Sequence, residues 1–275
     1  MDLITTLATS KFPFKYKVFK ALDRFGALSG ELKLRVGGKD FHVPADQWYF
    51  WQLRDATRYQ EKRLDSLCRL TGEFLADCHL LDLGADIGAV SRIMLAKMTN
   101  IHAVTALEPN PSAYRYLKAN LTGLPIPAEA LNIAVSDVSG LVNLERDASR
   151  QSDHSGFVRP DANGTTRAEP VDSFFTARCQ DLLVKIDVEG QERAVFLGAQ
   201  KTLRQARRVL LFVEIHRDVV DRTGISAEQI FSAAEAIRPC EWYLADPGTP
   251  PVDRARPFFD QFPARQYDVI GVMPS

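Results

Sequence analysis

Short apolar runs alternate with amphipathic stretches from about residue 78 to the end of the chain. Runs with few polar residues, such as "DLLVKIDVEG" (181–190) and "RVLLFVEIH" (208–216), are typical of strands covered on both faces. Stretches such as "AVSRIMLAKM" (89–98) and "PSAYRYLKANLT" (111–122) repeat apolar residues at helical spacing. This alternation predicts an α/β fold with a doubly wound, mostly parallel sheet.

The same pattern places the remaining elements of this region. Asn110 and Pro111 are a typical N-cap and first-turn pair, and Ser226 is expected to open another helix. The polar, Gly- and Pro-containing stretch 146–170 is expected to be a long loop, of the kind that often forms a lid or binding loop. Further strands are predicted at 79–84, 102–109, 131–137, 241–246 and 266–274, with an edge strand at 140–147, and further helices at 192–206 and 226–237.

Residues 1–70 are expected to form a small N-terminal extension, and residues 71–275 the main domain. "ELKLRVGGKDFHVP" (31–44) alternates around Gly37-Gly38 and predicts a hairpin. The stretch 48–70 is expected to be helical, with a buried face made by Leu53, Tyr59, Leu64 and Leu67.

Composition and charge are those of an ordinary soluble globular protein. Apolar residues make up 45% of the chain, charged residues 25%, and the net charge is -1, so the total charge does not favour nucleic acid as a partner. No run reaches the roughly 18 apolar residues that a membrane span requires. The first residues do not resemble a secretory signal. The cysteines show no metal-ligand spacing and are expected to be free, buried thiols of a cytoplasmic protein; they are Cys68, Cys78, Cys179 and Cys240.

One local stretch departs from this balance. "KFPFKYKVFK" (11–20) is both basic and aromatic. It is either a solvated amphipathic helix or a surface for a membrane or an anionic partner, and the sequence leaves both interpretations open.

The predicted strand 79–84 and the turn that follows it contain acidic residues, which are unfavourable for binding a phosphate. The turn reads Gly84-Ala85-Asp86-Ile87-Gly88, which does not meet the three-glycine dinucleotide pattern. Asp82 and Asp86 would repel a pyrophosphate in a partly dry site. A positively charged nucleoside without phosphates fits better, and S-adenosylmethionine is such a molecule. Gly84 and Gly88 would let the backbone approach its methionyl part.

Two neighbouring strand ends complete this predicted cofactor site. Glu108 ends the next strand, where an acid can accept both ribose hydroxyls. Ser136 or Asp137 ends the following strand and is expected to meet the adenine amino group.

Several strings resemble the FkbM-type S-adenosylmethionine-dependent methyltransferases. They are "LLDLGADIGAVSRIML", "ALEPNP", "NIAVSDVSG", "LFVEIH" and, most specifically, "KIDVEGQE" within "LLVKIDVEGQERAVFLGA". The resemblance implies a seven-stranded Rossmann-like methyltransferase sheet and O-methylation of a small-molecule or glycan hydroxyl, such as that of a sugar or natural product. Asp86 stands where the family usually has Asn, and Ala89-Val90 stand where an aromatic residue is frequent.

Candidates for acid–base chemistry lie at the ends of the later strands. Period two places Lys185, Asp187 and Glu189 on one side of their strand, with Lys185 expected to pair with an acid. Glu214 and His216 share a side of the next strand, and histidine suits a general base near neutral pH. We therefore expect Asp187, Glu189 and His216 to be catalytic. A structural role for each, or a divalent metal held by these three, stays open.

Other functions remain as alternatives. The domain could be a non-catalytic cofactor-binding module. A nucleic-acid methyltransferase is less well supported, because "DVEG" stands where base-flipping adenine enzymes usually carry an Asp/Asn-Pro-Pro-aromatic run. The aromatic run 48–51 could stack on a sugar or pack on the core, and His154 could contact a substrate.

Overall fold

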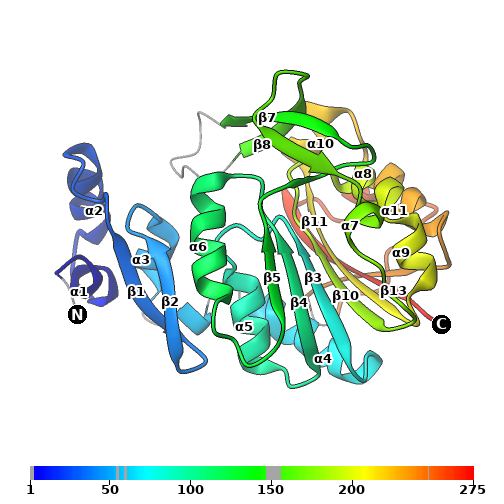
Figure 1. The fold of residues 1–275 in the computed structure, drawn as a ribbon, viewed down its shortest axis with the longest axis horizontal. Helices are drawn as coiled ribbons and strands as arrows, with labels where there is room; N and C mark the ends of the chain where they lie inside the picture. Colours follow the sequence, from blue (N-terminus) through cyan, green and yellow to red (C-terminus); the bar gives the residue numbers. More distant parts are fainter. Residues whose placement is uncertain (1–2, 54–55, 59–60, 147–155, 247) are drawn as a thin grey trace.

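The computed structural model of the chain describes residues 3–53, 56–58, 61–146, 156–246 and 248–275. Its centre is a seven-stranded sheet in the order β12-β13-β11-β10-β3-β4-β5 (Figure 1). The strands are β3 (Cys78–Leu83), β4 (Ile101–Leu107), β5 (Ala128–Leu131), β10 (Asp181–Ile186), β11 (Val209–His216), β12 (Glu241–Leu244) and β13 (Gln266–Met273). The pairs from β11 to β5 are parallel, and β13 runs antiparallel to both of its neighbours. The predicted doubly wound, mostly parallel fold is confirmed.

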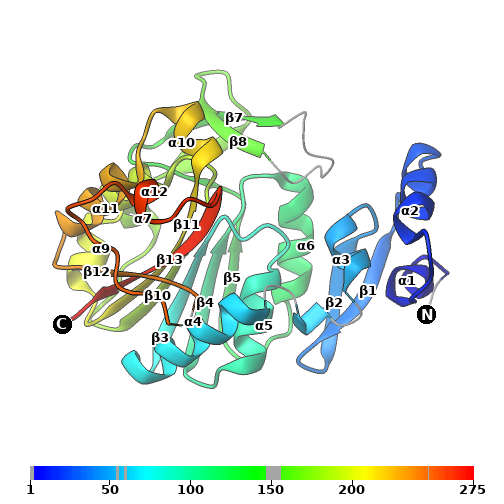
Figure 2. The ribbon, with the colours of Figure 1, turned by 180° about the vertical axis from the view of Figure 1, so that it is seen from behind.

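Helices cover both faces of this sheet, as Figures 1 and 2 show from opposite sides. Neighbouring strand residues alternate between the two faces: Leu80 belongs to one core cluster and Leu81 to the other. The first cluster includes residues of α4 (Glu61–Phe74), α5 (Ala89–Lys97) and α6 (Pro111–Leu121). The second includes residues of α8 (Glu192–Gly198), α9 (Gln200–Gln205) and α11 (Ala227–Glu235). Shorter helices are α7 (Val171–Phe174), α10 (Arg217–Thr223) and α12 (Phe258–Gln261).

The capping residues behave as the sequence predicts. The Asn110 side chain accepts a hydrogen bond from the Ser112 amide at 2.9 Å, with Pro111 in the first turn of α6. Ser226 and Gln229 form a capping box at the start of α11. The single helix expected at 192–206 is instead divided at Ala199 into α8 and α9.

The N-terminal extension contains the predicted hairpin, made of β1 (Glu31–Val36) and β2 (Lys39–Pro44). It is preceded by α1 (Leu3–Thr9) and α2 (Lys15–Arg24). The prediction of one helix over 48–70 is wrong, because the described residues there form α3 (Trp48–Gln52), the 3-10 turn η1 (Ala56–Arg58) and the start of α4. Leu64 and Leu67 are fully buried as expected, Leu53 is half-buried, and Tyr59 lies outside the described residues.

The extension is attached to the main domain by buried polar contacts and a common core. Asn120 of α6 accepts a hydrogen bond from the His42 amide at 2.7 Å, and its side-chain amide donates to the carbonyls of His42 and Ile87, both at 2.8 Å. The buried Arg92 of α5 donates to the carbonyls of Val36, Asp40 and Asn120. One apolar cluster runs from α1 and α2 to the central strands, and α4 crosses the expected boundary at residue 70.

A second, four-stranded sheet in the order β6-β9-β7-β8 lies at one end of the main sheet, at the top of Figure 1. Its strands are β6 (Ala134–Val135), β7 (Gly140–Arg146), β8 (Gly156–Pro160) and β9 (Thr166–Glu169). This corrects two expectations. The stretch 146–170 is not simply a long loop, since it contains β8 and β9, and the strand expected at 131–137 is divided between β5 and β6. His154 lies outside the described residues.

Two further expectations concern membranes and thiols. Throughout the described ranges, every helix is too short or too polar to cross a bilayer. All four cysteines are free; Cys78 is buried, Cys68 and Cys240 are half-buried, and Cys179 is exposed, so the expectation of buried thiols is wrong for Cys179. The cytoplasmic location stays a prediction.

Candidate functional site

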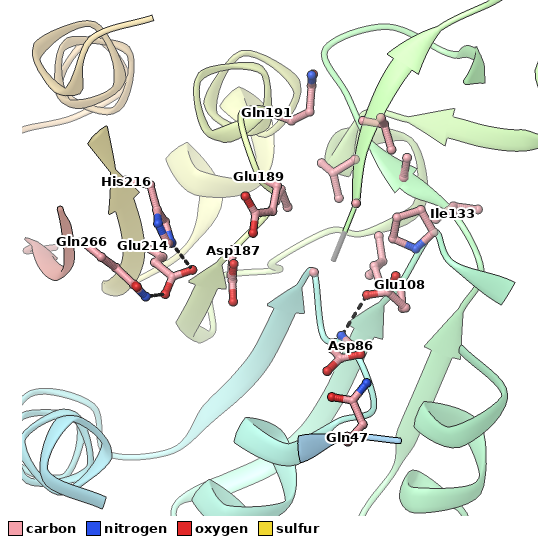
Figure 3. Close-up of a pocket in the computed structure, with 18 of the residues that line it drawn as sticks. Gln47, Asp86, Glu108, Ile133, Asp187, Glu189, Gln191, Glu214, His216 and Gln266 are labelled. Atoms are coloured by element: carbon pink, nitrogen blue, oxygen red, sulfur yellow. Dashed lines mark hydrogen bonds and ion pairs between the residues drawn. The ribbon is translucent and has the colours of Figure 1, made fainter. Parts of the chain in front are cut away.

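A cavity of about 390 Å³ opens at the carboxyl ends of β3, β4, β10 and β11 (Figure 3). Ligands of doubly wound sheets bind at this edge. The residues that line it are Gln47, Tyr49, Phe50, Gly84, Asp86, Leu107, Glu108, Pro109, Ile133, Ala134, Val135, Gly156, Val158, Asp187, Val188, Glu189, Gln191, Glu214, His216 and Gln266. They come from both sheets and from the N-terminal extension, so no single segment makes the cavity.

The turn after β3 is shaped by backbone conformation. Gly84 has φ +79°, and a Cβ there would lie 1.8 Å from the Asp187 carbonyl oxygen, so glycine allows β3 and β10 to end side by side. Asp86 has φ 50°, a left-handed conformation that Asp and Asn tolerate better than most residues. This explains why either residue suits that position. A Cβ on Gly88 would meet the Leu117 side chain at 2.9 Å, and Gly88 does not line the cavity.

Glu108 is held rigidly at the end of β4. One of its oxygens, Oε2, accepts a hydrogen bond from the Asp86 amide and the other, Oε1, from the Asn110 amide, both at 2.8 Å. Figure 3 shows its carboxylate beside Asp86. These two contacts fix the orientation of the carboxylate at the edge of the cavity.

Asp82 lies beneath the cavity lining rather than in it. It is fully buried, accepts a hydrogen bond from the Ser91 hydroxyl at 2.6 Å, and lies 3.2 Å from Lys185 Nζ. Lys185 also donates to the Gly84 carbonyl at 2.7 Å and lies 3.3 Å from Asp187 Oδ2. Burial alone would lower the pKa of Lys185, but the carboxylates of Asp82 and Asp187 outweigh it and raise that pKa. Lys185 is therefore paired with acids, as the sequence predicts.

The third strand end differs from the expectation. Ile133, Ala134 and Val135 line the cavity, whereas Ser136 and Asp137 are outside its lining and Asp137 is exposed. The chain enters β6 at Ala134, which carries the two polar residues away from the main sheet. This side of the cavity is apolar.

Acidic residues gather at the other side of the cavity, at the ends of β10 and β11. His216 Nε2 lies 2.9 Å from Glu214 Oε2, and the Gln266 side-chain amide donates to Glu214 Oε1. Asp187 lies between this group and Glu189 in Figure 3. The structure thus brings Asp187, Glu189 and His216 into one cavity, as the sequence predicts, and adds Glu214 to them.

The protonation of this group is set by burial and by its mutual contacts. Burial raises the pKa of Asp187 despite Lys185, and the neighbouring Glu214 raises it further, although 34% of the Asp187 side chain stays open to the cavity. For Glu214, hydrogen bonds with His216 and Asp187 outweigh burial and lower the pKa. For His216, the same contact with Glu214 outweighs burial and raises the pKa. Glu214 therefore keeps its charge more readily than Asp187 does.

Glu189 lies in the tight turn that follows β10, and Glu192 is the first residue of α8. Glu189 has φ 51°, its carbonyl accepts a hydrogen bond from Arg222 at 2.8 Å, and it lines the cavity. The buried Glu192 accepts a hydrogen bond from the Gly190 amide at 2.9 Å. Burial raises the pKa of Glu192 to about 7. The backbone-binding acid of this turn is Glu192, and the N-cap of α8 is Gln191, not Asp187.

The charge of the lining indicates what kind of ligand fits. Five carboxylates face the cavity, from Asp86, Glu108, Asp187, Glu189 and Glu214. Among the described residues that line it, none is Lys or Arg. A phosphate would be repelled by these carboxylates, whereas a sulfonium and an ammonium would be attracted. The residues present therefore fit S-adenosylmethionine better than a phosphate-bearing cofactor.

Some lining residues were not expected from the sequence. Gln266 reaches the site because it lies opposite His216 where β13 pairs antiparallel with β11, and no local pattern reveals that register. Gln191 could have been predicted from the sequence, because it directly follows the turn at the end of β10. Gln47, Tyr49 and Phe50 come from the extension; Phe50 is buried and Tyr49 is exposed, so the aromatic run contributes both to the core and to the cavity.

The metal site kept open for Asp187, Glu189 and His216 does not form. In the part of the chain that the structure covers, no group of three or more His, Cys, Asp or Glu side chains is arranged to hold a metal ion.

Comparison with known protein families fits this geometry. A family model described as the methyltransferase FkbM domain matches residues 82–238, which include the turn after β3, Glu108, Asp187 and His216. The chain belongs to the FkbM methyltransferase family. Membership confirms the predicted family and its cofactor, S-adenosylmethionine. The residues that hold this cofactor remain predictions.

Several solved structures resemble this FkbM family member at low identity. Methyltransferase FkbM from Methylobacillus flagellatus KT is 16% identical with a TM-score of 0.45, over 72% of this chain and 44% of that one. M. jannaschii TYW2, solved in complex with AdoMet, is 13% identical with a TM-score of 0.45, over 89% and 85%. This chain thus spans less than half of the Methylobacillus structure. A search of curated proteins finds no match.

Proposed function

We propose that the protein is an S-adenosylmethionine-dependent O-methyltransferase that acts on a hydroxyl of a sugar, a glycan or a secondary metabolite. The observation that supports it most is the cavity at the carboxyl ends of β3, β4, β10 and β11. On one side of this cavity, the carboxylate of Glu108 is held in place next to an apolar surface. The other side contains the pair of Glu214 and His216. None of the described residues that line the cavity is Lys or Arg.

The cofactor would occupy the side formed by β3, β4 and the 133–135 segment. Glu108 would accept hydrogen bonds from the two ribose hydroxyls, with its carboxylate oriented by the amides of Asp86 and Asn110. Asp86 would attract the ammonium, and Ile133 and Val135 would pack on the adenine. Asp82 would not contact the cofactor directly. It pairs with Lys185, which in turn binds the Gly84 carbonyl and lies beside Asp187, so it would hold these two residues in position.

The acceptor would occupy the side of Asp187, Glu189, Glu214 and His216. Gln191 and Gln266 offer amides that can hydrogen bond to a polyol, and Tyr49 offers an aromatic surface. An acceptor with a phosphate or carboxylate near its reacting hydroxyl would be repelled by these acids. A neutral, hydroxyl-rich acceptor therefore suits the site.

His216 is proposed as the general base. The cofactor supplies an already activated methyl group, so the protein mainly aligns the acceptor and removes its proton. His216 Nε2 lies 2.9 Å from Glu214 Oε2. The imidazole would take the proton of the acceptor hydroxyl as the hydroxyl oxygen bonds to the methyl carbon and the carbon–sulfur bond of the cofactor breaks. The charged imidazole is then balanced by Glu214.

Transfer of a labelled methyl group tests this proposal. The purified protein is incubated with methyl-labelled S-adenosylmethionine and a panel of neutral glycans, anionic sugars and polyketide-type alcohols. We expect label to enter a neutral hydroxyl acceptor. Donor binding without transfer to any acceptor would favour the alternative of a non-catalytic module, and transfer to a nucleic acid alone would contradict the proposal.

A further inference from the structure

The far end of the N-terminal extension exposes an unusual number of apolar side chains. Leu3 is 73% exposed, Phe14 70%, Tyr16 46% and Phe25 83%. They belong to α1, to α2 and to the residues that flank α2. Figures 1 and 2 show α1 and α2 at the outer end of the molecule, beyond the hairpin and away from the main sheet. We call this the α1–α2 surface.

The same surface is strongly basic. Residues 11–25 contain five basic residues, Lys11, Lys15, Lys17, Lys20 and Arg24, and one acidic residue, Asp23. The whole chain has a net charge of -1, so the positive charge is concentrated at this end. A local cluster of this kind attracts anionic surfaces even when the total charge does not.

The packing of α2 places Lys17 and Arg24 on its outer side, whereas Lys15 donates to the carbonyls of Ala8 and Ser10. Phe19 is buried, with ring centroids 5.0 Å from Trp48 and 5.3 Å from Trp51 of α3. Lys17 and Arg24 lie more than a quarter turn around the helix from Phe19 and are exposed. Since the apolar side of α2 is used inside the protein, its outward cations belong to a solvent-facing surface.

Aromatic rings and cations alternate along α2 and the residue before it. Lys17 Nζ lies 5.2 Å from the Phe14 ring centroid, and Lys20 Nζ lies 5.8 Å from that of Tyr16. Phe14 precedes α2 and Phe25 follows it, so apolar side chains stand at both ends of the row of cations. Contact of these apolar side chains with water is unfavourable, and an apolar partner would remove it.

We propose that the α1–α2 surface binds the face of an anionic lipid bilayer. Lys and Arg near such a surface are attracted by the charged headgroups, while Leu and Phe enter the boundary between headgroups and acyl chains. A nucleic acid would also attract the cations, but it offers no place for the aliphatic Leu3. The binding is peripheral and reversible, and it is independent of the function proposed for the cavity.

The position of the surface connects it with the cavity. Trp48 and Trp51, on which Phe19 packs, belong to the same short helix as Tyr49 and Phe50, which line the cavity. The α1–α2 surface is therefore connected with the cavity lining through α3.

Co-sedimentation of the full chain with vesicles tests this inference. We expect binding to vesicles of phosphatidylcholine mixed with phosphatidylglycerol, little binding to phosphatidylcholine alone, and a steep loss as salt is raised. No binding to the anionic vesicles, or binding that salt leaves unchanged, would overturn it. So would preferential binding of single-stranded DNA or RNA when these compete with the vesicles.

Three double variants locate the surface. Lys17→Glu/Lys20→Glu and Phe14→Ser/Phe25→Ser should each weaken vesicle binding at least about tenfold. The control Lys118→Glu/Lys201→Glu changes the charge by the same amount at exposed lysines of α6 and α9 and should keep at least half of the binding. An equal loss of vesicle binding in the control variant would contradict the assignment. So would unchanged vesicle binding in both surface variants, provided that they retain their affinity for S-adenosylmethionine.

Discussion

At the scale of single residues, the site depends on backbone turns that only certain side chains accept. Gly84, Asp86 and Glu189 all have positive φ directly after the ends of β3 and β10. These turns direct Asp86 and Glu189 into the cavity. The sequence revealed the acids at the strand ends, but the positive φ of Glu189 could not be predicted, because no glycine or asparagine marks it.

Replacing Gly84 by alanine should be far more harmful than the same change at another glycine of similar φ. In Gly84→Ala the new Cβ would overlap the Asp187 carbonyl oxygen, so we expect a loss of more than about 3 kcal/mol of unfolding free energy or failure to fold. Gly38→Ala is the control, since φ is +75° there and nothing lies within 4 Å. It should cost only about 1–2 kcal/mol. If urea denaturation gave the same loss of unfolding free energy for both variants, the close approach of residue 84 to the Asp187 carbonyl would not affect stability.

The proposed base makes a kinetic prediction. His216→Asn should lower kcat by about 10²–10⁴-fold while donor affinity changes little. In the wild-type enzyme kcat should rise with pH through a pKa above the usual histidine value, because Glu214 raises the pKa of His216. In Glu214→Gln this rise should move to lower pH. A pH profile that both variants share with the wild type would exclude His216 as the base.

Glu192 makes a prediction about stability and pH. Burial raises the pKa of its carboxyl in the folded protein to about 7, above the ordinary value of 4.5. Its contribution to stability is therefore complete below the ordinary pKa and is lost as pH rises through about 7. In Glu192→Gln the amide oxygen can still accept from Gly190, so the variant should gain on the order of a few kcal/mol relative to wild type between acidic and mildly alkaline pH. A difference in unfolding free energy between the variant and the wild type that stays constant across this pH range would contradict this.

At the scale of elements, the strands that were predicted correctly are those whose own sequence carries the signal. β10 and β11 are continuous apolar runs because both of their faces are covered. β8 and β9 were missed because they are short and polar, with "GFVRP" and "TRAE" as their sequences. Their existence depends on pairing with β7, which a local pattern cannot show.

The contact between the hairpin and α6 should be a major element-level determinant of stability. Asn120→Ala leaves the buried amide of His42 and the carbonyls of His42 and Ile87 without their side-chain partner, so we expect a loss of roughly 2–4 kcal/mol in chemical denaturation. Asn163→Ala, in an exposed turn, is the control and should stay within about 0.5 kcal/mol of wild type. A similar small effect at both positions would mean that the hairpin contributes little to the fold.

At the scale of the whole molecule, a net charge of -1 conceals two opposite regions. The cavity gathers five carboxylates from the turns after β3, β4 and β10 and the end of β11, and the α1–α2 surface gathers cations at the far end. The acidic side of this arrangement was predictable, because carboxyl ends of parallel strands meet at one edge. The contributions of Gln47 and Gln266 were not, since they depend on how the extension and β13 pack.

The central claim is that this cavity selects a positively charged adenosine derivative without phosphates. Calorimetric titration of the purified chain with S-adenosylmethionine, ATP and NAD+ in parallel tests it most directly. The account predicts that S-adenosylmethionine binds one to one, that Glu108→Ala weakens this binding at least about tenfold through loss of the ribose contacts, and that ATP and NAD+ do not bind. Tight binding of ATP or NAD+ with no binding of S-adenosylmethionine would contradict it.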